Sequence, residues 1–263
     1  MNKKLLFFDI DGTLLTEGEQ RYIPQSAIDA VYAAQRNGHY AFINTGRCIS
    51  ELEEPIRNLK FDGLVCGCGT YILYHDKVVY HHTLEEEVKR EVIADLNSCG
   101  LEGLLEGEHY IYYGKQEYVS RMEMIRREHF RSMSERILDM NEGIPDFDKF
   151  CFCLKDGCDF DRFYQKHKDG FTFIDRGRSF YEVVPSSCSK ASAMQYLAEY
   201  LQVAKEDTVA FGDSTNDIEM LAFAGTSIVM KKHDKEVEAY ADYITDTVEA
   251  DGIAKALQHF GLA

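Results

Sequence analysis

The stretch Phe7-Phe8-Asp9-Ile10-Asp11-Gly12-Thr13-Leu14-Leu15 ends an apolar run with two carboxylates and a glycine turn, almost at the N-terminus. Leu5 to Phe8 are typical of a strand buried on both faces, and the carboxyl ends of such parallel strands form the ligand crevice of α/β folds. Side chains two residues apart on a strand point to the same side, so Asp9 and Asp11 can face one centre. Two such anions require a cation, and Mg²⁺ suits carboxylate oxygens.

Length, charge and cysteine content narrow the class of protein. A chain of 263 residues is expected to form two domains, since single cores stop growing at roughly 250 to 300 residues. The net charge of −16 disfavours nucleic acid and anionic membranes as partners. The first apolar run is too short for a signal peptide, and no other run could span a membrane. Eight cysteines without an export signal indicate reduced thiols in a cytoplasmic protein.

The sequence up to residue 81 predicts alternating strands and helices. Proline near a helix start and glycine just past its end are typical boundaries. We expect a helix from Ile23-Pro24 to Asn37-Gly38, a strand over 40–43, a helix over 49–58, a strand over 63–66, and a hairpin of 71–74 with 78–80 that turns at His75-Asp76.

Residues 82–183 follow a different pattern, which predicts an inserted α+β module. Here we expect helices over 84–97 and 160–167, a hairpin over 101–113, charged helical sequence over 117–140, and strands over 150–154, 171–174 and 180–184. After Pro185 the alternation resumes, with helices over 189–201, 216–224 and 250–260 and strands over 208–211 and 227–230.

A second acidic turn, Gly212-Asp213-Ser214-Thr215-Asn216-Asp217, also follows an apolar strand and opens a helix. If that strand lies beside Leu5–Phe8, Asp213 can join Asp9 around one metal ion, with Asp11 contributing its backbone carbonyl. Asn216 and Asp217 would either bind that ion directly or contact the groups that bind it. Lys190, at the start of the preceding predicted helix, offers a cation where the anionic site needs one.

This set of residues suits phosphoryl transfer, which requires an in-line nucleophile and stabilisation of charge on the phosphoryl oxygens. Asp9 can attack phosphorus once Mg²⁺ and Lys190 offset its repulsion from a phosphate monoester. Asp11 can then give a proton to the leaving alkoxide and later take one from water. Thr45, at the end of the second predicted strand, can hydrogen-bond a phosphoryl oxygen.

These residues resemble the four motifs of the haloacid dehalogenase-like hydrolases, in the same order along the chain. The motifs are Asp9-Ile10-Asp11-Gly12-Thr13, Thr45-Gly46-Arg47, Lys190 and Gly212-Asp213-Ser214-Thr215-Asn216-Asp217. The insert between the second and third motifs resembles the C2 cap of the Cof-type subfamily. The resemblance implies an α/β fold, with a Rossmann-like three-layer core of mainly parallel sheet at 1–81 and 184–263 and a C2 cap at 82–183.

The same resemblance implies a Mg²⁺-dependent phosphatase that works through an aspartyl-phosphate. Its expected substrate is a small phosphorylated metabolite, with sugar phosphates ahead of pyridoxal phosphate and nucleotides, and its expected state is a monomer or weak homodimer. The implied roles are Asp9 as nucleophile, Asp11 as acid and base, Thr45, Gly46, Arg47, Lys190 and Asn216 at the phosphate, and Asp9, Asp11, Asp213 and Asp217 at the metal.

Other functions remain open at this stage. A phosphomutase would use the same nucleophile but return the phosphoryl group to the substrate, and a phospho-ligand-binding protein would not turn over. Arg47 could contact substrate or form a surface ion pair. The chain also departs from the family at Cys68-Gly69-Thr70, where relatives carry Asn-Gly-Ala, and at Lys231-Lys232-His233, where they carry Gly-Asn-Ala.

The spacing of the cysteines favours packing over metal binding. Cys66 and Cys68 form one pair and Cys151 and Cys153 another, each with one residue between. Structural zinc sites favour longer spacings. Both pairs are therefore predicted to be thiols on strands.

Overall fold

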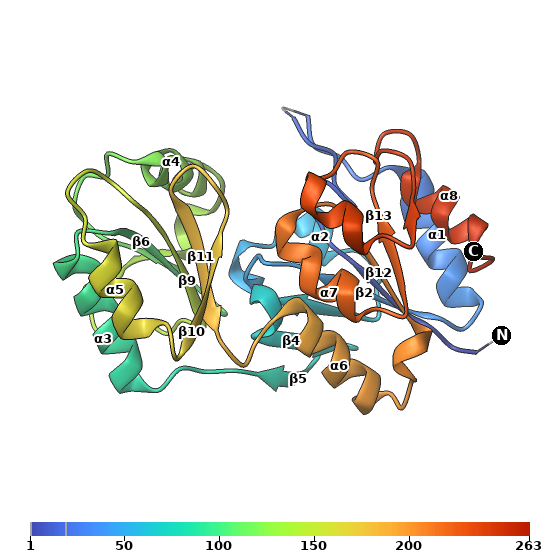
Figure 1. Cartoon of the computed structure of the whole chain (residues 1–263), viewed down its shortest axis with the longest axis horizontal. Coiled ribbons are helices and arrows are strands. Elements are labelled where there is room, and N and C mark those ends of the chain that lie inside the picture. Colours follow the sequence, from blue (N-terminus) through green and yellow to red (C-terminus); the bar gives the residue numbers. More distant parts are fainter. Residues whose placement is uncertain (1, 19) are drawn as a thin grey trace. The chain divides into compact units, whose positions relative to one another are not determined.

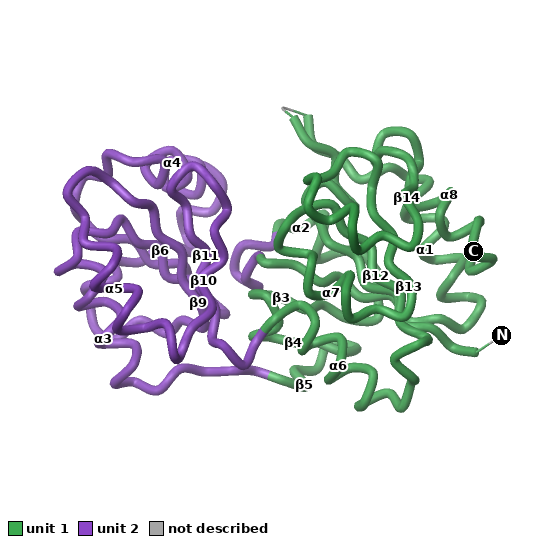
Figure 2. Tube along the Cα trace, viewed as in Figure 1, with its two compact units in different colours: residues 1–46, 53–80, 189–263 green, residues 47–52, 81–188 purple. Residues whose placement is uncertain are grey.

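The computed structural model describes residues 2–18 and 20–263, which form two compact units (Figures 1 and 2). Unit 1 contains the described residues up to Gly46 together with Glu53–Tyr80 and Ser189–Ala263. Unit 2 contains Arg47–Leu52 and His81–Cys188. The short segment 47–52 therefore belongs with the inserted sequence, although it lies far from it along the chain.

The larger sheet has eight strands in the order β14-β13-β12-β1-β2-β3-β4-β5. These are β1 (Leu5–Phe8), β2 (Tyr40–Asn44), β3 (Gly63–Cys66), β4 (Tyr71–Tyr74), β5 (Lys77–His81), β12 (Thr208–Gly212), β13 (Thr226–Val229) and β14 (Tyr243–Ile244). The strands from β14 to β3 run parallel, and β4 is antiparallel to β3. The predicted pairing of the first strand with the strand before Gly212 is confirmed by the register Phe8 to Phe211.

Helices cover both faces of this sheet and make a three-layer α/β unit (Figure 1). Leu5 and Phe7 pack in one core with side chains of α6 (Lys190–Tyr200) and α7 (Ile218–Phe223). Leu6 and Phe8 point the other way by strand alternation, toward the face where α1 (Gln25–Arg36) and α8 (Gly252–His259) lie side by side. Burial on both faces explains the uninterrupted apolar sequence of β1.

Unit 2 is an α+β module built on a six-stranded sheet in the order β10-β11-β9-β6-β7-β8. Its strands are β6 (Glu102–Glu106), β7 (Ile111–Tyr113), β8 (Ile137–Asp139), β9 (Lys149–Cys153), β10 (Phe171–Asp175) and β11 (Phe180–Pro185), and its helices are α3 (Glu86–Ser98), α4 (Arg121–Met133) and α5 (Phe160–His167).

The two faces of this sheet differ in character. On one face, α3 and α5 pack over an aromatic core centred on Phe150, Phe152 and Phe163. On the other face, α4 packs over a smaller cluster that includes Cys151 and Cys153. The alternation of side chains along β9 thus places phenylalanines on one side and cysteines on the other. The predicted packing of the two strand cysteines is confirmed, since both are buried free thiols.

The structure corrects three sequence predictions. The helix predicted over 49–58 is instead a short 3₁₀ turn at Ile49–Glu51 and a one-turn α2 at Glu54–Arg57, because the chain is extended between them and Pro55 can occupy only the first turn of a helix. The helical segment predicted over 117–140 ends at Met133, and strand β8 follows. Cys68 lies in a tight turn with a φ of 53° rather than in a strand.

Two shorter features also fall outside the predictions. Strand β14 is only two residues long, too short to give a periodic pattern. No helix among residues 2–18 and 20–263 combines the length and apolar character needed to cross a bilayer.

The aromatic core of unit 2 predicts a large cost for truncating Phe152. This ring is fully buried and its centroid lies 5.4 Å from that of Phe163. We expect Phe152→Ala to lower the free energy of unfolding of unit 2 by about 3–5 kcal/mol, measured by urea denaturation followed by circular dichroism. Met124→Ala, at a side chain that is 65% exposed, is the control. Equal effects of the two changes would contradict this assignment of the core.

Candidate active site

The ends of two neighbouring parallel strands bring Asp9 and Asp213 together. Asp9 follows β1 directly, and its backbone N–H donates to the carbonyl of Phe211 at 3.0 Å. Asp213 follows β12 directly, and β1 and β12 are hydrogen-bonded in register. Carboxyl ends of adjacent parallel strands meet at one edge, which is where α/β sheets bind ligands.

Three carboxylates meet at this edge. Oxygen atoms of Asp9, Asp213 and Asp217 all lie within 4.8 Å of one another, and all three side chains are buried. The Thr13 hydroxyl donates to Asp213 Oδ1 at 2.6 Å. A Cβ atom at Gly12 would lie only 2.7 Å from the Asp213 carboxyl carbon, so the turn needs glycine for its close approach as well as for its φ of 82°.

The Lys190 ammonium binds two of these carboxylates. Its Nζ lies 2.7 Å from Asp9 Oδ1 and 2.6 Å from Asp217 Oδ1, and the side chain is buried. Lys190 is the first residue of α6, which Ser189 caps by accepting the N–H of Ser192. Burial opposes the charge, but Asp217 and Asp9 together raise the pKa of Lys190. The lysine is therefore a permanent cation of the site.

Asp217 holds the second acidic turn in shape. Its Oδ2 accepts the backbone N–H groups of Asp213 at 2.9 Å and of Ser214 at 3.0 Å, while its Oδ1 binds Lys190. Asn216 accepts the Ser214 hydroxyl at 2.7 Å. Both oxygens of Asp217 are thus already acceptors, which suits it to orienting the turn and Lys190.

Crowding raises the pKa of two of the carboxyl groups. Desolvation is the main cause for Asp9, offset in part by Lys190 and reinforced by Asp217, and its pKa rises to about 7. Desolvation, with repulsion from Asp9 and Asp217, raises the pKa of Asp213 to about 8. Without a further cation, the anionic form of this cluster is therefore destabilised near neutral pH.

The chemistry of this cluster fits a divalent ion such as Mg²⁺. Three buried carboxylates face a single ammonium, which leaves surplus negative charge. Lys190 contacts Oδ1 of Asp9 and Thr13 contacts Oδ1 of Asp213, so the second oxygen of each carboxylate can serve as a ligand. Oxygen ligands and two surplus charges are what Mg²⁺ sites provide.

Asp11 is exposed, whereas the three aspartates of the cluster are buried. Its carboxylate pairs with the Arg21 guanidinium at the return of the loop that follows β1. Sequence reasoning missed Arg21, because no pattern links a loop arginine to an aspartate ten residues earlier. Thr13 could have been found, since it belongs to the same motif as Asp9 and Asp11.

Thr45 lies at the neighbouring strand end. It is buried, its N–H donates to Val65 at 2.9 Å, and its carbonyl accepts the N–H of Cys68 at 3.0 Å. Asn44, which the sequence analysis also did not single out, donates to the carbonyl of Lys190 at 3.1 Å. Gly46 ends this part of unit 1, and Arg47 begins the segment that groups with unit 2.

The segment Lys231-Lys232-His233, where the chain differs from the family's Gly-Asn-Ala, is followed by a residue that contacts the acidic turn. The N–H of the following Asp234 donates to the carbonyl of Asp213 at 2.8 Å. Lys232 pairs with Glu17 at 2.5 Å, and His233 Nδ1 contacts the carbonyl of Met230 at 2.6 Å. Both lysines of this loop are thus exposed and ion-paired, Lys231 with Asp246 and Lys232 with Glu17.

Comparison with known proteins gives one consistent family. A sequence model of the haloacid dehalogenase-like hydrolases matches residues 6–257. The chain is 28% identical to the 5-amino-6-(5-phospho-D-ribitylamino)uracil phosphatase YcsE of Bacillus subtilis, over 98% of this chain and 96% of that protein.

Solved structures agree with this result. BT1666, a phosphatase of Bacteroides thetaiotaomicron, superposes with a TM-score of 0.85 and 27% identity, covering 99% of this chain and 96% of that one. BT4131, a sugar phosphatase of HAD subclass IIB, superposes with a TM-score of 0.80 and 25% identity, covering 99% and 100%.

The raised pKa values predict that Mg²⁺ stabilises the protein more at pH 8 than at pH 5.5. A carboxyl group whose folded pKa is raised contributes stability at low pH that is lost as pH rises through about 7 for Asp9 and about 8 for Asp213. Mg²⁺ binds the anionic forms, and at about 100 times its Kd it would add about 2.7 kcal/mol. Thermal denaturation with and without Mg²⁺ at both pH values measures this difference.

The control for this measurement is Asp213→Asn, which removes a ligand charge but keeps the size of the side chain. We expect its melting temperature to respond weakly to Mg²⁺. An equal response to Mg²⁺ at both pH values in the unaltered protein would contradict binding at this cluster.

Proposed function

The chain belongs to the haloacid dehalogenase-like hydrolases and is a phosphatase, and from this premise we propose that it hydrolyses a small phosphorylated metabolite through an aspartyl-phosphate, with Mg²⁺ as cofactor. The observation that carries the proposal is the buried Lys190 ammonium between Asp9 and Asp217, with Asp213 alongside. One ammonium and an acidic cluster that could hold Mg²⁺, at a strand end, suit the binding and transfer of a phosphoryl group.

In the first half of the proposed reaction, a carboxylate oxygen of Asp9 attacks phosphorus and the ester P–O bond breaks. Lys190 orients Asp9 through its 2.7 Å contact and offsets charge as the phosphoryl group approaches. The Asp11 carboxyl group gives its proton to the departing alkoxide. A bound Mg²⁺, held by Asp9, Asp213 and the Asp11 carbonyl, would supply positive charge against the phosphoryl oxygens.

In the second half, water attacks phosphorus and the bond between Asp9 and phosphorus breaks. The Asp11 carboxylate takes the proton of that water, so Asp9 is restored and inorganic phosphate leaves. The exposure of Asp11 supports this role, because a group that exchanges protons with the leaving group and with water needs access to both.

The remaining candidate residues are assigned to the phosphate and to the turns that hold it. We assign Thr45, Gly46 and Arg47 to the phosphoryl oxygens, Asn216 to the rim of the acidic turn, and Asp217 to positioning Lys190 and supporting the metal. We further propose that residues 1–81 and 184–263 form the catalytic core, and that residues 82–183 form a C2 cap that selects the leaving group.

A phosphorylated sugar or sugar alcohol is the proposed substrate. BT4131 is named a sugar phosphatase, and the named substrate of YcsE carries a phosphoribityl group. The net charge of −16 disfavours nucleic acid. The eight free cysteines support a reducing, cytoplasmic setting, and we propose a monomer or weak homodimer.

The experiment that tests this function is a phosphate-release screen over a panel of metabolite phosphates. Sugar and polyol phosphates should lead the panel. Accumulation of free phosphate with turnover distinguishes hydrolysis from a mutase, which would convert the substrate without releasing phosphate. Activity should disappear in EDTA and return with Mg²⁺.

Asp9→Asn is expected to reduce phosphate release to the level of the blank, because an amide oxygen cannot act as the nucleophile. The circular dichroism spectrum should be unchanged, since the side chain keeps its size and can still accept from Lys190. Phosphate release at the unaltered rate would place the nucleophile elsewhere.

Asp11→Asn is expected to lower kcat by about 10²–10⁴-fold, the usual contribution of a general acid or base. The loss should be smaller for a substrate with a good leaving group such as 4-nitrophenyl phosphate, which needs less protonation. An equal loss for good and poor leaving groups would argue against proton donation by Asp11.

A further inference from the structure

Residues 47–52 follow the Thr45-Gly46 turn directly and are held by contacts within unit 2. The Ser50 hydroxyl donates to the carbonyl of Gly107 at 2.7 Å. Arg136 donates to the carbonyls of Ser50 at 2.7 Å and Leu52 at 3.4 Å. These contacts use backbone carbonyls, a neutral hydroxyl and a guanidinium, none of which changes its charge in the neutral pH range.

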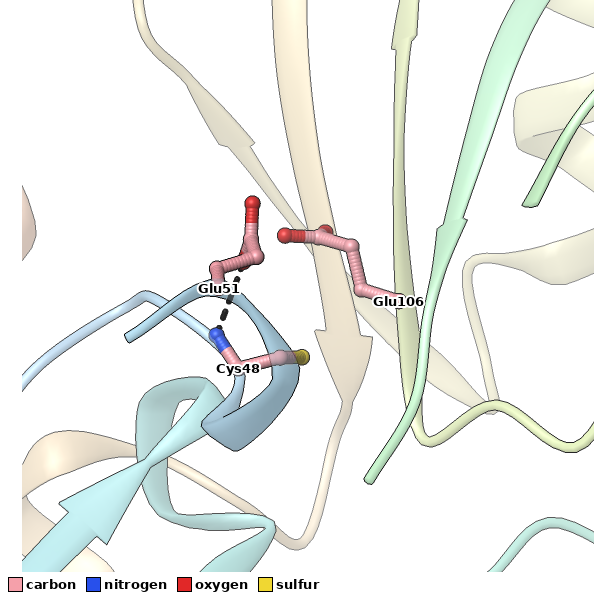
Figure 3. Close-up of side chains that lie close together, drawn as sticks. All are labelled: Cys48, Glu51 and Glu106. Atoms are coloured by element: carbon pink, nitrogen blue, oxygen red, sulfur yellow. Dashed lines mark hydrogen bonds between the residues drawn. The ribbon is translucent and has the colours of Figure 1, made fainter. Parts of the chain in front are cut away.

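Glu51 contributes a carboxyl group to this segment. Its carboxylate accepts the N–H of Cys48 at 2.8 Å, which closes the 3₁₀ turn, and its other oxygen lies 3.7 Å from His129 Nε2 (Figure 3). The carboxyl groups of Glu51 and Glu106 point toward one another in the same view. One oxygen atom of each lies within 4.8 Å of the other.

The sheet register of unit 2 places Glu106 in a buried charged row. Glu106 on β6 lies opposite Lys149 on β9, and Glu182 on β11 lies opposite Cys151. Lys149 Nζ donates to Glu106 at 3.1 Å and to Glu182 at 2.7 Å. The Cys151 thiol donates to Glu106 at 2.9 Å. Glu106 is thus held by two side chains of the neighbouring strand β9.

This row carries more carboxyl groups than cations. Glu106 and Glu182 share the single ammonium of Lys149, and Glu51 lies beside Glu106 and 3.7 Å from His129. Titratable and charged groups that face the Glu51 and Glu106 pair are Cys48 on its own segment, Lys149 and Cys151 on β9, Asp148 beside them, Glu182 on β11, His129 on α4, Tyr113 on β7 and Arg136 after α4.

A hydrogen bond between two carboxyl groups requires a proton, since two carboxylates have only acceptors. Glu106 is only 3% exposed. Desolvation raises the pKa of Glu106 well above its ordinary value; Lys149 opposes this shift, and the neighbouring Glu51 and Glu182 add to it. Burial and repulsion therefore both favour the protonated pair.

We propose that Glu51 and Glu106 share a proton, and that this pair is a pH-dependent positioning contact for the phosphate-binding turn at Thr45 to Arg47. With the proton present, the pair fixes residues 47–52 against β6. When the proton is lost, two carboxylates repel each other and the segment loosens. The proposal rests on the proposed function, which assigns Thr45 and Arg47 to the phosphate.

A proton accounts for these side chains better than a metal ion does. The Cys48 sulfur and the two carboxyl groups lie close enough to be ligands. However, Glu106 already accepts from Lys149 and Cys151, and burial raises the pKa of the Cys48 thiol well above its ordinary value. A metal would have to displace the ammonium and ionise the thiol.

Hydrogen exchange of peptides that cover residues 47–52 tests the contact directly in the full-length protein. Protection factors, corrected for the intrinsic rate at each pH, should be high at about pH 5 and fall by about pH 9, because the stabilisation from a carboxyl group of raised pKa is lost as pH rises. Protection that does not change over this range would overturn the shared proton.

Three variants sharpen the test. In Glu51→Gln the amide donates to the Glu106 carboxylate without a titratable proton, so protection should stay high at every pH. In Glu51→Ala it should be low at every pH, with Ser50 and Arg136 still in place. Glu53→Gln, an exposed neighbour, is the matched control and should follow the unaltered protein. A pH dependence in Glu51→Gln equal to that of the unaltered protein would also overturn the proposal.

Kinetics then test the link to the phosphate turn. The ratio of KM in the unaltered protein to KM in Glu51→Gln should rise with pH, by at most about tenfold per pH unit for a single proton, while the kcat ratio changes less. This ratio cancels the titration of Asp9 and Asp213. A flat KM ratio together with pH-dependent protection would overturn the link but keep the shared proton.

These outcomes are distinct from failure of the proposed function. If the unaltered protein released no phosphate from any substrate at any pH, the phosphatase assignment would fail. The hydrogen-exchange result would still decide whether Glu51 and Glu106 share a proton.

Discussion

The buried ammonium of Lys190 is the interaction on which the candidate site depends. It joins the end of the first strand to the turn after β12, through Asp9 and Asp217. A buried charge without a partner costs several kcal/mol, so each member of this group is stable only because the others are present. The position of α6 is thereby tied to the chemistry, since Lys190 is its first residue. The contacts of the Lys190 ammonium with Asp9 and Asp217 therefore hold this edge of the sheet together and also set its chemistry.

Much of the fold could be predicted because unit 1 is built from short apolar strands that end in polar turns. β1, β2 and β12 were each visible as such a run, and α5 begins and ends at the predicted residues. The segment 49–58 was mispredicted as one helix, whereas its tertiary contacts and Pro55 favour two short turns. β8 and β14 were missed because two or three residues carry no period.

The residues of the candidate site could also be predicted only in part from the sequence. Asp9, Asp213 and Lys190 could be named from the sequence because each follows a recognisable strand or opens a helix. The partnership of Arg21 with Asp11 could not, since it depends on the path of a loop. The contact of Glu51 with Glu106 could not either, because it depends on how β6 is registered against β9 and on where a segment from the first fifth of the chain returns.

The central place of β1 in its sheet has a consequence for biosynthesis. One edge of β1 pairs with β2 soon after both leave the ribosome, but the other must wait for β12, at residues 208–211. Apart from residues 47–52, unit 2 is made of residues 81–188, so it can fold while the N-terminal half-sheet is still open. At about 5–20 residues per second, translation leaves that apolar edge uncovered for several seconds or more. Until its last third is made, the nascent chain therefore exposes an unpaired apolar strand edge, to which a chaperone can bind.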